Sequence, residues 1–332
     1  MKLNKKQLQQ DQEALMDEIL LLADKTQTQI EHLIDVSTKN IEDAIKKIYF
    51  NYRNRYNLTD AEAIRYLKRK LTAADVINLV GLGYLDQADA ASATNQINRL
   101  MVLKRYIRKQ TNTIKQFQTT HLERLLVNVT TLAYNKTIFN ISKNVGFVID
   151  FQKMPQKKIN KLLHHNWLDS NFYKRIQNNC GKFQNKVEAV LTDGILRGKS
   201  VDYMSEELTK ISHYGKRTSE QLIRTEASHF NNQAELEAYQ ELEIEQYVFL
   251  ATLDSRTSNI CRDLDGKIFP VSKSQEGVNF PPMHPRCRST TMIYYSQDVL
   301  TNLKRRAKMK DGKKIVLNKF TTYREWEKMM IV

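Results

Sequence analysis

Residues 279–290 read NFPPMHPRCRST, and this stretch decides which kind of fold the end of the chain can form. Four of the chain's five prolines lie in it or in the nine residues before it: Pro270, Pro281, Pro282 and Pro285. Proline fixes φ and removes a backbone N–H donor, so the stretch predicts a rigid turn. Within it, His284 and Cys287 stand three residues apart. That spacing fits a metal site, a catalytic site or a simple corner, and the neighbouring segments must decide among them.

The segments on either side of this turn resemble β-strands. Residues 246–252 (QYVFLAT) and 289–295 (STTMIYY) are rich in β-branched and aromatic side chains, which favour strands. Between them lie the turn-forming residues 254–267 (DSRTSNICRDLDGK) and a short apolar run, IFPV. The sequence therefore predicts a small antiparallel β unit over residues 246–300.

The preceding residues have a helical pattern. Residues 5–55 contain no Gly or Pro, and their apolar positions recur at spacings of three and four, as in one or two amphipathic helices. Residues 59–62 (TDAE) and 218–221 (TSEQ) have the form of capping boxes that open helices. Gly198 is expected to end one helix, and Ser200 to cap a short one after it.

We therefore expect an α+β fold that is mainly α. A long helical N-terminal half precedes a helical segment and the small antiparallel β unit. The expected regions are a helical N-terminal region over 1–140, a basic then acidic helical region over 141–245, the β unit over 246–300 and a basic C-terminal tail over 301–332.

The net charge of +15 is concentrated in two parts of the chain. Residues 101–200 carry 18 basic and 5 acidic groups, and residues 251–332 carry 16 and 8. Such clusters are the usual footprint of a polyanionic partner, most often nucleic acid, although a solvated lysine-rich face is the alternative. We expect non-specific contact with DNA through residues in two groups. The first is Lys104, Arg105, Arg108 and Lys109, and the second is Lys157, Lys158, Lys161, Lys174 and Arg175.

Composition argues against two classes of protein, those that span a membrane and those held together by disulfides. The mean hydropathy is −0.55, and no run of about 18 apolar residues occurs, so we expect no transmembrane helix and no membrane partner. Three cysteines are an odd number and too few for a disulfide scaffold, which favours a reducing compartment.

Three segments near the end of the chain carry a family resemblance. They are IRTEASHFNNQAELEAY (223–239), LDSRTSNICRDLDGKIF (253–269) and FPPMHPRCRS (280–289). In this order they resemble the phage Mu F-like minor head proteins, also called head morphogenesis proteins, of tailed bacteriophages. The segment 305–326 is similar to a tail common in members from Gram-positive hosts. The resemblance covers roughly residues 185–326.

The resemblance also implies a zinc site. Many members carry C-x-x-C before H-x-x-C, a pattern that looks like four zinc ligands. Here the first cysteine is replaced by Ser258, which leaves Cys261, His284 and Cys287. A structural zinc ion takes four ligands in a tetrahedron. Candidates for the fourth ligand are Asp254, Asp263, His229 and a water molecule. A bound ion is expected to be structural, in a zinc-knuckle-like corner. The alternative is that the metal is lost and Cys261 packs beside His284 in a hydrogen-bonded turn.

Other motif residues are expected to have structural roles. Asp254 can accept backbone N–H groups and pair with Arg256 or Arg288 in a self-satisfied turn network. Arg224 and Glu226 belong to an R-T-E triplet, which could indicate nucleotide-transferase chemistry. No glycine-rich phosphate loop accompanies the triplet, so an ion pair that ties this helix to the β unit is expected instead.

The resemblance implies a non-enzymatic minor capsid protein. Its expected partners are the portal protein, other head proteins and packaged phage DNA. Its expected location is the virion, in the head interior or at the portal vertex, and the host cytoplasm during assembly. The alternatives are a zinc-dependent nucleic-acid-processing enzyme similar to HNH nucleases, or a DNA-binding protein. A nuclease would need a further catalytic His and an Asn or His on a following helix, whereas the residues after Cys287 are strand-like and lack histidine.

Overall fold

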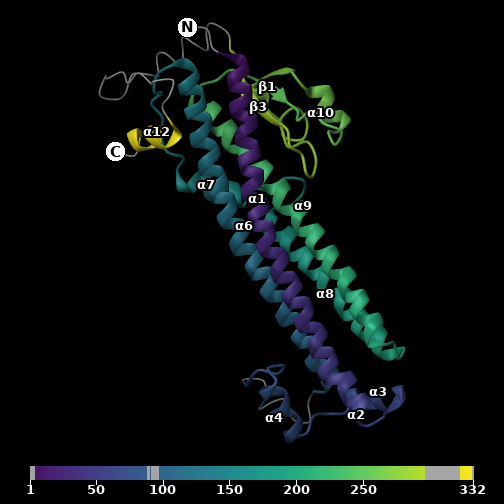
Figure 1. The fold of residues 1–332 in the computed structure, drawn as a ribbon. Coiled ribbons are helices and arrows are strands. Elements are labelled where there is room, and N and C mark those ends of the chain that lie inside the picture. The colour runs from purple at the N-terminus through teal and green to yellow at the C-terminus, as the bar shows by residue number, and fades with distance from the viewer. Residues whose placement is uncertain (1–3, 88–89, 91–96, 296–321, 331–332) are drawn as a thin grey trace. The chain divides into compact units, whose positions relative to one another are not determined.

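The computed structural model describes residues 4–87, 90, 97–295 and 322–330. These residues form a mainly helical protein with one three-stranded antiparallel sheet, which confirms the predicted fold class (Figure 1). The helices are α1 (Lys5–Ile45), the π-helical turn η1 (Lys46–Phe50), α2 (Asn51–Arg55), α3 (Asp60–Lys68), α4 (Ala73–Gly81), α6 (Arg99–Val145), α7 (Gln156–Leu163), α8 (Phe172–Leu196), α9 (Val201–Glu241), α10 (Asn259–Leu264), the short η2 (Val271–Lys273) and α12 (Tyr323–Met330). The strands are β1 (Gln246–Leu250), β2 (Ile268–Pro270) and β3 (Thr290–Ile293).

Several helix ends lie where the capping residues predict. Thr59 and Glu62 form the complete capping box at the start of α3. The Ser200 hydroxyl accepts a hydrogen bond from the Tyr203 N–H at the start of α9, at 3.1 Å. Gly198 has a φ of 62°, in the left-handed region, and follows the last turn of α8. These local signals were therefore sufficient to place three helix ends.

The prediction that residues 218–221 open a separate helix is wrong. α9 runs without a break through these residues, so the expected short helix after Ser200 is wrong as well. The Thr218 hydroxyl donates back to the carbonyl of Tyr214 at 3.1 Å, as a threonine does inside a helix. The sequence motif is present, but its threonine does not cap a helix.

The chain forms two compact units, each built from several segments. The first unit comprises Met1–Thr26, His121–Phe172 and Gln221–Val332, and the second comprises Gln27–Thr120 and Tyr173–Glu220. Helices α1, α6 and α9 therefore contribute residues to both units. The division of the chain into four consecutive regions, which we expected from the sequence, remains a prediction.

The second unit contains a bundle made of segments of α1, α6, α8 and α9. The side chains of Ile34 and Phe183 are packed close to Gly215 of α9, where an added Cβ would lie 3.0 Å from the Phe183 ring. A buried hydrogen bond of 2.7 Å from Gln118 to Ser219 joins α6 to α9. Gly215 therefore allows α9 to pack closely against its neighbours.

The first unit contains the sheet, in the order β2-β1-β3. Successive side chains of the central strand β1 point to opposite faces. Val248 and Leu250 belong to a large hydrophobic core that also includes residues of α6 and α9. Phe249 belongs to a smaller buried cluster with Cys261 and Cys287. Phe249 therefore connects the sheet to the corner formed by Cys261, His284 and Cys287, which we call the Cys/His corner.

Helix α12 packs into the first unit. Trp326 is 1% exposed, and its ring lies 5.4 Å from that of Phe139 and 5.6 Å from that of Phe151. The rest of the predicted basic tail, residues 301–321 and 331–332, lies outside the described residues. No helix in the described part of the chain has the length and apolar character needed to cross a membrane.

Candidate metal centre

Cys261 is positioned by α10, a short helix within a segment that the sequence predicted to be a turn. For these six residues the prediction is wrong. Ser258 is the N-cap of α10, and its hydroxyl accepts a hydrogen bond from the Cys261 N–H at 3.3 Å. Cys261 therefore lies in the first turn of the helix, where it is 2% exposed and packs in the small cluster with Phe249.

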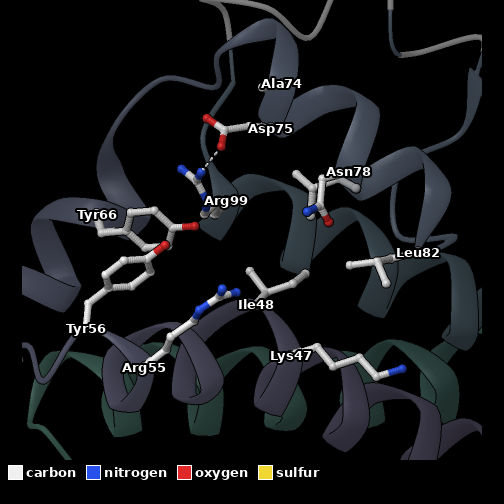
Figure 2. A pocket seen from close by; sticks show the side chains of 11 residues that line it. Lys47, Ile48, Arg55, Tyr56, Tyr66, Ala74, Asp75, Asn78, Leu82 and Arg99 are labelled. Atoms are coloured by element: carbon white, nitrogen blue, oxygen red, sulfur yellow. Dashed lines mark hydrogen bonds and ion pairs between the residues drawn. The ribbon is translucent and has the colours of Figure 1, made fainter.

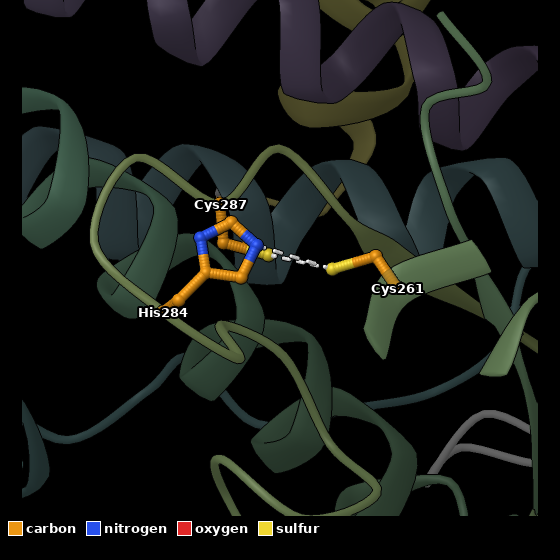
Figure 3. Close-up of side chains that lie close together, drawn as sticks. All are labelled: Cys261, His284 and Cys287. Atoms are coloured by element: carbon orange, nitrogen blue, oxygen red, sulfur yellow. Dashed lines mark hydrogen bonds between the residues drawn. The ribbon is translucent and has the colours of Figure 1, made fainter. Parts of the chain in front are cut away.

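His284 and Cys287 come from the proline-rich turn. The Cys287 N–H donates to the His284 carbonyl at 3.1 Å. Between them, Arg286 has a φ of 63°, which residues other than glycine seldom adopt. Its N–H donates to the hydroxyl of Thr225 on α9 at 3.0 Å, and this bond holds the turn in place. As a result the two side chains converge on Cys261 (Figure 3).

Two of the three distances among the candidate ligand atoms match the edges of a zinc tetrahedron. Cys261 Sγ lies 3.7 Å from Cys287 Sγ and 3.4 Å from His284 Nε2 (Figure 3). With Zn–S bonds of about 2.3 Å and Zn–N bonds of about 2.0 Å, a tetrahedron has S–S edges of about 3.8 Å and S–N edges of about 3.5 Å. These side chains therefore fit a zinc ion at three of its four positions.

The imidazole of His284 has the tautomer that a metal ligand needs. Its Nδ1 lies 2.9 Å from the carbonyl of Pro285, which can only accept, so Nδ1 carries the proton. Nε2 then presents its lone pair to the cluster. The Ser258 hydroxyl lies 2.9 Å from Nε2 and donates to it. The serine therefore lies beside the position at which a fourth ligand would bind.

The two thiols differ in acidity. A hydrogen bond from Cys287 lowers the pKa of Cys261 to about 5, although burial acts in the opposite direction. The same hydrogen bond, together with burial, raises the pKa of Cys287. Cys261 is therefore the thiol that loses its proton more readily. The thiolate is the form that binds metal, so binding of an ion by these sulfur atoms would release protons.

The fourth ligand does not come from another Cys, His, Asp or Glu in the described part of the chain. The side chains considered for this position lie outside the group: Asp254, Asp263 and His229. A cavity of about 20 Å³ adjoins Cys261 and His284, with Ser258 in its wall. It has room for about one water molecule. Within the part of the chain that the structure describes, the Ser258 hydroxyl and a water molecule in this cavity are the candidates for the fourth position.

Asp254 anchors the segment before α10. Both of its carboxylate oxygens accept from the Arg288 guanidinium at 2.7 Å, and one also accepts from the Arg256 N–H at 2.9 Å. The Arg288 guanidinium holds the pKa of the Asp254 carboxyl well below its ordinary value. These contacts are those of a self-satisfied turn network that joins this segment to the residue after Cys287.

The R-T-E triplet makes three separate contacts within the first unit. Arg224 forms an ion pair of 2.7 Å with Asp24 of α1. Glu226 is 1% exposed and accepts a hydrogen bond from the Trp167 indole at 3.0 Å. Thr225 supports the proline-rich turn, as described above. Thr225 thus provides one link between this helix and the β unit, and the ion pair expected from Arg224 and Glu226 stays a prediction.

A row of buried polar side chains joins α9 to β3, and no motif in the sequence predicted it. Asn232 donates to the Ser289 carbonyl at 3.2 Å, and Glu235 accepts from the hydroxyls of Thr290 at 2.9 Å and Thr291 at 3.2 Å. We call these five residues the polar seam. Burial raises the pKa of Glu235 to about 7. The sequence does contain a signal for the polar seam. Polar residues occupy the positions of α9 at which a helix usually has a buried apolar stripe.

The proposed DNA-contacting residues lie on three helices: Lys104, Arg105, Arg108 and Lys109 on α6, Lys157, Lys158 and Lys161 on α7, and Lys174 and Arg175 on α8. Some of these charges are partly neutralised. Arg108 lies 3.4 Å from Glu188, Lys109 lies 2.6 Å from Asp86, and Lys158 pairs with a glutamate of α9. By contrast, Lys157 and Lys161 are exposed and form no ion pair with any residue that the structure describes.

The fold and the site together define a class of protein that is mainly helical and has a small sheet with a Cys/His corner packed against it. Residues 185–292 match the model of a family described as Phage Mu protein F like protein. This part of the chain is therefore a Mu F-like region, and the resemblance predicted from the three motifs is confirmed. The matched segment includes the Cys/His corner and the polar seam. No curated protein and no solved structure matches the chain significantly.

Proposed function

We propose that the protein is a minor capsid protein that acts in the head morphogenesis of a tailed bacteriophage and is not an enzyme. The family match over residues 185–292 carries this proposal, because head morphogenesis is the role associated with Mu F-like proteins. The proposed partners are the portal protein and other proteins of the inner capsid. The proposed location is the head interior or the portal vertex, after assembly in the host cytoplasm.

The geometry of the Cys/His corner supports a structural role for a bound ion. A catalytic zinc keeps an open position to which a substrate can bind. Here Cys261 and Cys287 are buried, and the adjoining cavity of about 20 Å³ has room for about one water molecule. An ion held by these residues would instead join α10 to the proline-rich turn.

We propose that the protein contacts packaged DNA without sequence preference. Residues 101–200 carry 18 basic groups and only 5 acidic groups, which supports this proposal. The exposed Lys157 and Lys161 on α7 support it as well. Contacts of lysine with phosphate release counterions, so the affinity would fall steeply with salt. In a gel shift at about 50 mM salt, the full chain should retard duplex DNA of any sequence. The absence of a shift would contradict this part of the proposal.

Quantitative mass spectrometry of purified particles, combined with cross-linking, tests the main proposal. We expect a few copies per particle and cross-links to the portal protein. Particles assembled without the portal protein are the matched control, and the protein should be depleted from them. Complete absence from mature particles would contradict a virion role. Metal-dependent nicking of plasmid DNA, abolished by His284→Ala, would contradict the non-enzymatic role.

A further inference from the structure

A second candidate site is a pocket of about 440 Å³ within the second unit (Figure 2). Its walls come from η1, α2, α3, α4 and the start of α6. Pockets for small organic ligands have volumes of about 300–1,000 Å³, so this one is large enough to bind such a molecule. None of its residues belongs to the Cys/His corner, the polar seam or the proposed DNA contacts.

The pocket has an excess of positive charge. Lys47, Arg55 and Arg99 line it, against a single carboxylate, Asp75. That carboxylate is already engaged: it accepts from the N–H and hydroxyl of Thr72 at 2.9 Å and pairs with Arg99. Lys47 and Arg55 form no ion pair within the described part of the chain. Two positive charges are therefore left for a ligand.

Arg99 has a hydrogen-bonding group that lacks a partner. The residue is 3% exposed, its Nη2 is bonded to Asp75, and its guanidinium carbon lies 3.7 Å from the centroid of the Tyr66 ring (Figure 2). Among the residues that the structure describes, its buried Nη1 has no hydrogen-bond acceptor. A buried donor on a charged group is unfavourable without an acceptor. An oxygen atom of an anion in the pocket would provide one.

The rest of the lining favours a flat, apolar group on the same ligand. Tyr56 is 56% exposed, and the Arg55 guanidinium lies 5.8 Å from its ring centroid. Ile48 and Leu82 add aliphatic surface. Nucleic-acid bases stack on exposed aromatic rings with little dependence on the base. The pocket thus combines an anion site with a surface on which a base can stack.

We propose that this pocket binds a nucleotide through its phosphate monoester, either as a free nucleoside monophosphate or as the phosphorylated 5′ end of a DNA strand. A phosphate monoester carries a charge of about −1.5 to −2 at pH 7 and three acceptor oxygens. This charge and these oxygen atoms match the two unpaired cations, Lys47 and Arg55, and the free Nη1 of Arg99. The three residues come from three separate elements. A carboxylate, with one charge and two oxygens in one plane, would satisfy fewer of these groups. The proposal does not rest on a role in the phage head.

Calorimetric titration of the full chain with dAMP tests the proposal. The wild-type protein should bind dAMP, and Arg55→Gln should weaken binding about 10- to 100-fold, as expected for a lost hydrogen bond between charged groups. Tyr56→Ala should weaken the binding of dAMP but not of inorganic phosphate. Lys68→Gln is the matched control, because Lys68 is an exposed cation of α3 that does not line the pocket. Arg55 and Tyr56 are exposed, so these variants should fold.

An oligonucleotide with a 5′ phosphate, compared with the same strand bearing a 5′ hydroxyl, distinguishes the two sources of the ligand. Tighter binding of the phosphorylated strand, lost in Arg55→Gln, identifies a DNA end, whereas binding of dAMP alone identifies a free nucleotide. Three results would overturn the proposal. They are no binding of dAMP at millimolar concentration, equal effects of Arg55→Gln and Lys68→Gln, and equally tight binding of benzoate.

Discussion

Replacement of Ser258 by cysteine should convert the Cys/His corner from three protein ligands to four. The Ser258 hydroxyl lies 2.9 Å from His284 Nε2, so a sulfur atom at this position would face the same point as Cys261 and Cys287. Four-ligand structural zinc sites bind with about 10–16 kcal/mol, or about 3 kcal/mol for each ligand. The substitution should therefore tighten zinc binding about 100-fold.

The same substitution should have the opposite effect when zinc is absent. Ser258 caps α10 by accepting from the Cys261 N–H, and loss of a serine N-cap costs about 1 kcal/mol. Ser258→Ala loses the cap and gains no ligand, so it is the matched control. In chelator both variants should unfold about 1 kcal/mol more readily than the wild type. At free zinc 100-fold above its Kd, Ser258→Cys should gain about 2.7 kcal/mol and become the more stable variant.

Urea denaturation in EDTA and in buffered zinc measures these stabilities, and competition with a chromophoric chelator measures the Kd. Elemental analysis should find one zinc ion per chain of Ser258→Cys. If Ser258→Cys binds zinc no more tightly than Ser258→Ala, then Ser258 does not lie at the fourth position. If zinc stabilises the wild type and Cys261→Ser equally, the corner is not where the ion binds.

Three further predictions concern packing, burial and charge. Both Gly215→Ala and Gly181→Ala gain helix propensity. In urea denaturation, however, Gly215→Ala should be about 1–3 kcal/mol less stable than Gly181→Ala, because its Cβ would lie 3.0 Å from an aromatic ring whereas the other meets no atom within 4 Å. Burial raises the folded-state pKa of Glu235 from 4.5 to about 7, so the folded protein binds this proton more tightly. The wild type should lose about 3 kcal/mol of stability relative to Glu235→Gln as the pH rises from about 4.5 to 7, and parallel pH profiles would contradict this. In duplex DNA binding, the double change Lys157→Gln and Lys161→Gln should reduce the slope of log K against log salt by about 2, and an unchanged slope would exclude both from phosphate contact.

The regular elements could be predicted because their signals are local. The strands over residues 246–252 and 289–295 and the helical character of residues 5–55 follow from side-chain type and spacing, and the structure has both. The continuity of α9 through Thr218 could not be predicted in this way. This threonine can cap a helix or bond back to the carbonyl four residues earlier. The close packing at Gly215 and the bond to Ser219 lie inside one continuous helix, and these contacts come from other helices.

The candidate metal centre could be predicted only in part. The spacing of His284 and Cys287 and the order of the motifs indicated three candidate ligands, which the structure brings together. The segment 254–267 contains so many turn-forming residues that its short helix was not expected. The role of Thr225 could not be predicted either, because it depends on a contact with a residue 61 positions later in the chain.

The polar seam and the Cys/His corner stabilise the same segment. Thr225 holds the turn at Arg286, and Asn232, two helical turns further along α9, holds Ser289. Glu235 then bonds to the first residues of β3. A buried hydrogen bond contributes about 1 kcal/mol, so these four contacts together contribute about 4 kcal/mol, comparable to the gain from one zinc ligand. The segment after His284 is thus attached to α9 along its length without a metal ion. This attachment gives a physical reason why the corner can keep its shape with serine at position 258.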